Sequence, residues 1–175
     1  MQAKTLARAF SLALASIAAA NLAIAVEPPP VPYPEGYRQW AHVKSMVIQP
    51  GHALFDAFGA LGLHAEDRRR IHHLYANPKA EQGYKAGKFP DGAVIVFDLL
   101  EAKAADNTVQ EGARKVLGVM RKDAKKYAAT GGWGYEGFKG DSKTERAVAA
   151  NAATACHGCH AAQKDKDYVF SAYRK

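Results

Sequence analysis

Hydrophobic and polar positions alternate along several short stretches of this chain, and proline or glycine bounds each stretch. The segment QWAHVKSMVIQ (39–49) mixes β-branched and aromatic residues with partial alternation and stops at a Pro-Gly pair, which predicts a strand. RIHHLYAN (70–77) predicts a second strand. PDGAVIVFDLLEAK (90–103) predicts a third, because a Pro-Asp-Gly turn precedes a run of β-branched and aromatic residues.

The pattern is less regular in the second half of the chain. Residues 114–122 fit a strand or a helix by periodicity alone, and Gly118 favours the strand. A segment rich in glycine and aromatic residues follows at 130–140. The run DYVFSAYR (167–174) ends the chain with a strand-like composition.

Two segments predict helices. PKAEQGYKAG (78–87) starts with proline and ends with glycine, the residues that favour a helix start and a helix end. SKTERAVAANAATACHGCHAAQ (142–163) is rich in alanine, with Ser142 or Thr144 as the candidate N-cap. Several strands and few helices predict an α+β fold, mainly an antiparallel β-sheet with a few helices packed on it.

Gly132, Gly134 and Gly137 match the G-x-G-x-x-G pattern of dinucleotide-binding proteins. We interpret this match as coincidental, because Trp133 and Tyr135 would crowd a pyrophosphate and no helix of a βαβ unit follows. Close packing of the backbone against aromatic rings is the simpler role for these glycines.

The first residues predict a secretory signal. Residues 1–25 carry Lys4 and Arg8 before an alanine-rich apolar run that ends in a small-x-small pattern. An uncleaved membrane anchor is the alternative, but the run is short for a bilayer. We expect a proline-rich lead-in at 26–36, one domain at 37–175, and a periplasmic protein that is not embedded in the membrane after cleavage.

Composition excludes some functions. Apolar residues make up 48% of the 175 residues, enough for a folded core, and the formal net charge is +7. The basic residues are scattered and interleaved with acidic ones, so we expect no binding to nucleic acid.

Both cysteines of the chain lie in ACHGCHAAQ, as Cys156 and Cys159, with His160 directly after them. A disulfide would close too small a loop to stabilise the fold much, and a redox pair is expected after a strand of a βαβ unit. A zinc site would need further ligands at matching spacing. The remaining interpretation of Cys-x-x-Cys-His is covalent haem attachment, with two thioether bonds and His160 as the axial iron ligand; His157 is a spacer.

Five blocks of the chain resemble the cytochrome P-460 family. They are YRQWAHVKSMVI, HHLYANPKA, KFPDGAVIVFDLLEAK, GVMRKDAKKYAATGGWGYEGF and ACHGCHAAQKDKDYVFSAYR. The resemblance implies a mostly antiparallel sheet, a homodimer and a haem near the C-terminal helix. It puts the thioether bonds on Cys156 and Cys159 and the iron on His160, with one c-type haem per chain and an open distal side.

The resemblance also implies two chemistries within the family. The hydroxylamine-oxidising enzymes have a lysine cross-linked to the porphyrin, a distal glutamate and a distal arginine, whereas the cytochrome c-prime-beta type lacks the cross-link and binds gases. Alignment on these blocks puts Phe97, Gly118 and His72 at those three positions. The chain is therefore expected to be nearer the c-prime-beta type, binding nitric oxide or carbon monoxide and working with a periplasmic redox partner.

Alternatives remain open. Phe97 is either a lid over the distal iron position or a core aromatic residue. An enzyme that oxidises hydroxylamine or nitric oxide would need a cross-link from a nearby lysine (Lys85, Lys88 or Lys103) and could use Glu136 for proton transfer. An electron-transfer cytochrome would need Met46 or Met120 as the sixth iron ligand. His72 and His73 are adjacent in a predicted strand, so at most one of them faces the haem pocket.

Overall fold

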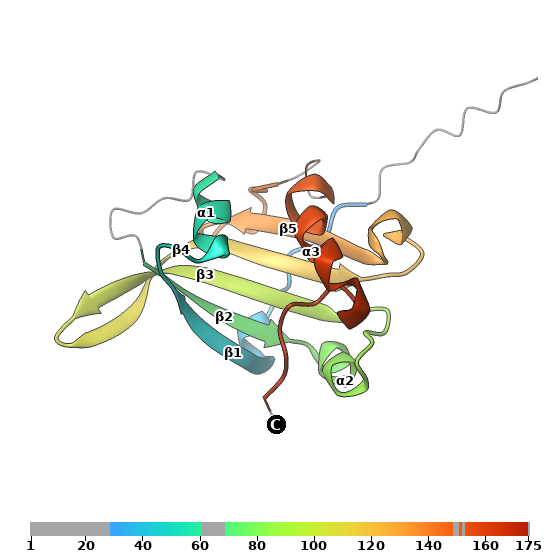
Figure 1. Cartoon of the computed structure of the whole chain (residues 1–175), viewed down its shortest axis with the longest axis horizontal. Coiled ribbons are helices and arrows are strands. Elements are labelled where there is room, and N and C mark those ends of the chain that lie inside the picture. Colours follow the sequence, from blue (N-terminus) through green and yellow to red (C-terminus); the bar gives the residue numbers. More distant parts are fainter. Residues whose placement is uncertain (1–28, 61–68, 149–150, 152, 175) are drawn as a thin grey trace, which may run out of the picture.

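Five antiparallel strands form one sheet, and their order in the sheet is their order in the chain. They are β1 (Ala41–Ile48), β2 (Arg70–Ala76), β3 (Val94–Ala105), β4 (Thr108–Lys122) and β5 (Trp133–Lys139). Figure 1 shows that the hairpin of β3 and β4 extends beyond the other strands. The antiparallel sheet with few helices confirms the predicted α+β fold, and β1 to β4 fall where the sequence predicts strands.

The computed structural model describes residues 29–60, 69–148, 151 and 153–174. The predicted signal (1–25) lies outside these residues. Within the described part of the chain, no helix is both long enough and apolar enough to cross a membrane.

The tip of the long hairpin is a two-residue turn, Asp106-Asn107. Both residues have positive φ, 50° and 57°, as the tight turns that match the twist of paired strands require. Aspartate and asparagine tolerate this conformation better than other residues with a side chain. The strands therefore run further than predicted, through residues 104–105 and 108–113, because this turn signal completes the hairpin.

Strand β5 occupies the segment that the sequence marks only as rich in glycine and aromatic residues. Six of its seven residues are buried, so the sequence lacks the alternation of polar and apolar residues that marks a half-exposed strand. A Cβ on Gly134 would lie 2.4 Å from the ring of Tyr127, and one on Gly137 would lie 3.2 Å from Ala147 Cβ. These glycines therefore allow close packing of the strand. This is the role expected for them if the G-x-G-x-x-G match is coincidental.

The helices lie before, between and after the strands. Among the described residues they include α1 (Ala53–Ala60), α2 (Pro78–Ala86), a π-helical turn (Ala153–His157), α3 (Gly158–His160) and 3₁₀ turns at Tyr37–Gln39, Ala128–Thr130 and Ala161–Lys166. Helix α2 confirms its prediction, because Asn77 caps it by accepting a hydrogen bond from Ala80 N at 2.9 Å and Gly87 ends it in the left-handed region.

The prediction of one helix over 142–163 is wrong in its first part. Ser142 Oγ accepts hydrogen bonds from the amides of Thr144 and Glu145, but they close a turn and start no helix. Ala147 N then donates to Gly137 O at 2.7 Å, so this segment pairs with the edge of β5. Pairing with the sheet outweighs the predicted helix start in this part of the segment. Among the described residues of this segment, helical conformation begins at Asn151.

The prediction of a strand at 167–174 is also wrong. Asp167 and Tyr168 have positive φ, 51° and 65°, which ends the 3₁₀ turn in a sharp bend. The residues after them form no ladder with the sheet, although Val169 is buried in the core.

The two faces of the sheet carry different cores. The helical face presents Ile95, Phe97, Leu99, Val116 and Tyr135 to α1, α2 and the C-terminal segment. The N-terminal face presents Val94, Val96, Leu117, Val119 and Phe138, which residues 31–40 cover. Figure 1 shows α1 and α3 above the same side of the sheet.

A buried carboxylate joins the strands to the N-terminal segment. Asp98, which is fully buried on the N-terminal face, accepts hydrogen bonds from Tyr37 Oη (2.6 Å), Arg114 Nε (2.6 Å) and Arg38 Nη2 (2.9 Å). Burial and the neighbouring Asp98 raise the pKa of Tyr37, so its hydroxyl remains a donor. Tyr37, Arg38 and Arg114 thus all donate hydrogen bonds to this one carboxylate.

Replacing Asp98 should therefore destabilise the protein strongly. Asp98→Ala leaves Arg114 and Tyr37 without their acceptor, and we expect the free energy of unfolding to fall by about 3–5 kcal/mol. Glu111→Ala, which removes the exposed partner of Arg38, should cost less than about 1 kcal/mol. Urea unfolding of the haem-loaded variants measures both. Equal losses in the two variants would contradict this role for Asp98.

Candidate haem-binding site

The Cys-x-x-Cys-His segment lies over the helical face of the sheet. Cys156 is in the π-helical turn, is partly buried and packs against the cluster that contains Ile95, Trp133 and Tyr135. Cys159 and His160 belong to α3, and Cys159 is exposed. One thiol thus points toward the apolar core and the other remains accessible.

His160 is held in one orientation. Its Nδ1 lies 2.7 Å from the carbonyl oxygen of Tyr168, and since a carbonyl only accepts, Nδ1 carries the hydrogen. Burial lowers the pKa of His160 and favours the neutral ring. Nε2 then keeps a free lone pair, which is the arrangement of a metal-ligating histidine fixed by a backbone acceptor.

The structure does not favour the other uses of two cysteines. Both thiols are free, so the segment contains no disulfide. Burial raises the pKa of Cys156 to about 11, the opposite of what a reactive redox thiol needs. Among the described residues, no three histidine, cysteine or acidic side chains converge as a metal site. The donor set present, two thiols and one oriented imidazole beside an apolar face, fits a covalently attached haem.

The three positions singled out for the distal side lie together. Phe97 in β3 and Gly118 in β4 are directly paired, and a Cβ on Gly118 would lie 3.4 Å from Phe97 Cβ. The ring of His72 stacks on that of Phe97, with centroids 4.4 Å apart and planes at 22°. Phe97 packs against both the cluster that includes Cys156 and the cluster that includes Leu54 of α1. Its role toward haem stays a prediction.

The two adjacent histidines face opposite sides of β2, as the strand prediction requires. His73 Nδ1 lies 2.6 Å from Ser45 Oγ, and its Nε2 lies 2.9 Å from Glu111. His72 is 2% exposed on the helical face. Burial lowers the pKa of His72 to about 4, so the ring is neutral. His72 is therefore the one of the pair that faces the candidate site.

The residues needed for the alternative functions are placed less suitably. Lys85, Lys88 and Lys103 are exposed, and Phe97 occupies the position that the resemblance assigns to the cross-linked lysine. Glu136 is buried with its carboxylate on the N-terminal side, where it accepts a hydrogen bond from Arg146 at 2.6 Å.

The two methionines belong to different clusters. Met120 packs in the cluster of Cys156, whereas Met46 packs in that of α1. Met120 is thus the better candidate for a sixth iron ligand, the role that an electron-transfer cytochrome would need.

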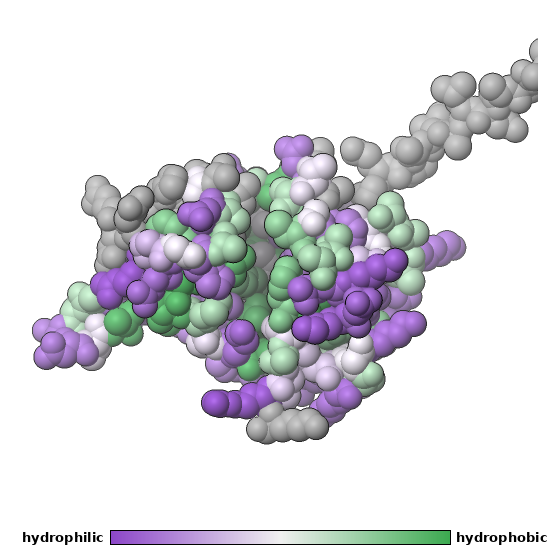
Figure 2. Space-filling model, viewed as in Figure 1, coloured by the Kyte–Doolittle hydropathy of each residue, from purple (hydrophilic) through white to green (hydrophobic). Residues whose placement is uncertain are grey.

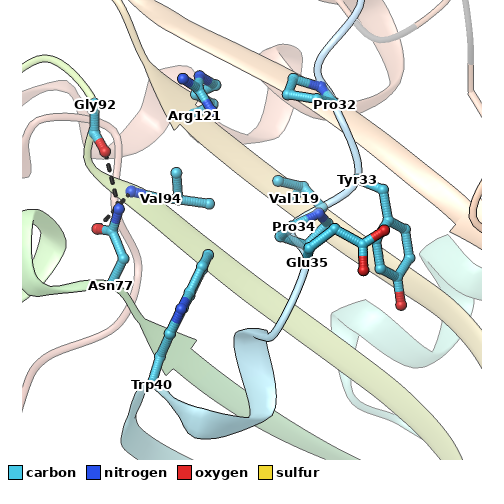
Figure 3. Close-up of a pocket in the computed structure, with 10 residues that line it drawn as sticks. All are labelled: Pro32, Tyr33, Pro34, Glu35, Trp40, Asn77, Gly92, Val94, Val119 and Arg121. Carbon is cyan, nitrogen blue, oxygen red and sulfur yellow. Dashed lines mark hydrogen bonds between the residues drawn. The ribbon is translucent and has the colours of Figure 1, made fainter.

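Figure 2 shows a hollow with apolar walls between the surface over α1 and the surface over α3. Its sides carry the two clusters that Phe97 joins. A separate pocket of about 260 Å³ lies on the N-terminal face (Figure 3), lined by Tyr33, Trp40, Asn77, Val94, Val119 and Arg121, among others. In it, the amide of Asn77 donates to Gly92 O (2.9 Å) and accepts from Val94 N (3.0 Å), so it serves the fold.

The sequence identified Cys156, Cys159, His160, Phe97 and His72, but it missed Tyr135 and Tyr168. Tyr135 packs within 5.1 Å of the His160 ring, centroid to centroid, and Tyr168 supplies the carbonyl that orients it. Neither has a local motif. Tyr168 acts through its backbone, which side-chain patterns do not report.

A known protein family matches most of the chain. Residues 34–171 match the family Cytochrome P460. No curated protein matches the chain. The family match covers most of the chain, including the Cys-x-x-Cys-His segment and the strands that carry His72, Phe97 and Gly118. The chain therefore belongs to the Cytochrome P460 family of haem-binding cytochromes, as its sequence blocks predict.

Proposed function

We propose that this protein is an exported c-type cytochrome that carries one covalent haem and binds a small diatomic molecule, such as nitric oxide, at an open iron. The observation that supports this most is the pairing of Phe97 with Gly118 on the helical face. There the resemblance puts the lysine and glutamate of the hydroxylamine-oxidising enzymes. A phenyl ring forms no cross-link and glycine transfers no proton.

The proposed attachment uses three residues of one short segment. Cys156 and Cys159 would form the thioether bonds, and His160 would hold the iron through Nε2 while its Nδ1–H stays bonded to the Tyr168 carbonyl. When bound, the haem iron supplies the open coordination position. The apolar clusters around Phe97 exclude water and anions, since burying a charged or unpaired polar group there is costly. A neutral diatomic is therefore the favoured ligand.

The proposal extends to the cellular setting. Export through residues 1–25 would bring the chain to the periplasm. A homodimer and a periplasmic redox partner are part of the same proposal, and both rest on the resemblance to the family.

An electron-transfer function is the second candidate, and one observation favours it. Met120 packs in the cluster that also contains Cys156, so its thioether lies on the face that the haem would occupy. A methionine in an apolar cluster is also an ordinary core residue. The two functions predict different coordination of the iron, so one spectrum separates them.

Peptide mass spectrometry tests the attachment. We expect the tryptic peptide 147–164, which contains both cysteines, to carry the full mass of one haem. Cys156→Ser and Cys159→Ser should each keep a single thioether bond, and the double variant should lose the haem on acid extraction. Porphyrin on a peptide that contains Lys85, Lys88 or Lys103 would instead support the cross-linked enzyme.

Absorption spectra of the reduced protein test the open iron. We expect a five-coordinate high-spin spectrum that changes on addition of carbon monoxide or nitric oxide, because His160 occupies only one side. Met120→Leu serves as the control and should leave the spectrum of the unliganded protein unchanged. A low-spin spectrum that neither gas changes, and that becomes high-spin in Met120→Leu, would show an electron-transfer cytochrome instead.

A further inference from the structure

His72 is a buried polar side chain without a hydrogen bond. It is 2% exposed, and neither Nδ1 nor Nε2 has a partner among the residues that the structure describes. Its neighbours in the sheet are Met46 of β1 and Leu99 of β3, and its ring stacks on Phe97. Buried hydrogen-bonding groups normally have a partner, so the unpartnered ring of His72 needs an explanation.

Other histidines of the described chain are used differently. His73, the next residue in β2, contacts Ser45, and His160 bonds the Tyr168 carbonyl. His42 lies 2.9 Å from Ser45 Oγ. Burial without a partner lowers stability, and a leucine or phenylalanine at position 72 would suit the same neighbours without that cost. The imidazole therefore weakens the fold in the free protein.

The side chain lies on the same face of the sheet as the candidate haem site. His72 lies on the helical face of the sheet, and Phe97, on which it stacks, packs against the cluster of Cys156 and the cluster of α1. Burial keeps the ring neutral, helped by the positive Lys44 nearby and by His73 and His52. A neutral imidazole has one N–H donor and one acceptor nitrogen. Among the described residues, no group accepts a hydrogen bond from this donor.

We propose that His72 is a specificity-determining residue of the site, whose ring N–H donates a hydrogen bond to the outer atom of the diatomic ligand on the iron. This inference rests on the proposed function. The hydrogen bond strengthens in the low-dielectric wall and favours ligands whose outer atom gains negative charge on binding. Phe97 fixes the ring plane by stacking, so the donor is oriented before the ligand arrives.

The test compares variants at two adjacent positions in the haem-loaded protein. His72→Leu removes the donor, His72→Gln keeps an N–H donor, and His73→Leu is the matched control on the other face of β2. We expect the C–O stretching frequency of the ferrous carbon monoxide complex to rise in His72→Leu. Nitric oxide release should accelerate about tenfold, equivalent to about 1.4 kcal/mol. His72→Gln should restore part of both, and His73→Leu should change neither.

A stability measurement separates this role from a structural one. Since His72 has no partner to lose, His72→Leu should keep or raise the urea midpoint of unfolding. A lower midpoint with an unchanged C–O stretch would overturn the proposal, because His72 would then serve the fold alone. So would an iron that is six-coordinate before ligand addition and five-coordinate only in His72→Leu, since His72 would then be an iron ligand.

The outcomes also separate this inference from the proposed function. If the unaltered protein binds neither carbon monoxide nor nitric oxide, the proposed function fails, and the role of His72 fails with it. If it binds them and His72→Leu gives the same C–O stretch and release rate, only the role of His72 is overturned.

Discussion

The hydrogen bond between His160 Nδ1 and the Tyr168 carbonyl orients His160, the candidate iron ligand, and the proximal side of the candidate site depends on this orientation. That carbonyl is in place because the chain bends at Asp167 and Tyr168, two residues with positive φ. The sheet holds the bend. Lys122 Nζ and Phe89 N donate to the Asp167 carboxylate at 2.6 and 2.8 Å. Trp133 Nε1 donates to the Asp167 carbonyl at 2.8 Å.

The proximal half of the site is therefore built by the ends of β4 and β5, far along the chain from the histidine's neighbours in sequence. A Cβ on Gly131 would lie 2.2 Å from the Tyr168 ring, so glycine is required for the bend to approach the sheet. The proposed distal half lies at the middle of β2, β3 and β4, where His72, Phe97 and Gly118 meet. One sheet connects the two halves of the candidate site, although separate segments supply them.

The elements that the sequence predicted correctly are those whose residues form a recognisable local pattern. Strands β1 to β4 have β-branched runs bounded by turn residues, helix α2 has both of its end signals, and the Cys-x-x-Cys-His motif is contiguous. The two wrong predictions, the start of the helix at 142–163 and the strand at 167–174, concern segments whose conformation is determined by tertiary contacts. The alanine-rich composition of 142–163 favours one helix, but Arg146 reaches the Glu136 carboxylate and the Val31 carbonyl, and residues 146–147 pair with β5. The bend at 167–168 likewise depends on Lys122, which no local pattern reveals.

Strand β3 shows how the fold keeps the site apolar. Phe97 and Leu99 point to the helical face, and Asp98 between them points to the other face, because side chains alternate along a strand. The charged group of Asp98, Arg114 and Arg38 is thus behind the wall of the candidate site and satisfied on its own side. Strand β3 itself therefore contributes no charged group to the helical face at residues 95–99. A one-residue shift in the register of β3 would exchange the two faces and bring a carboxylate to the haem side. The pairing of β3 with β2 and β4 is therefore as necessary for a site selective for neutral ligands as the residues that line it.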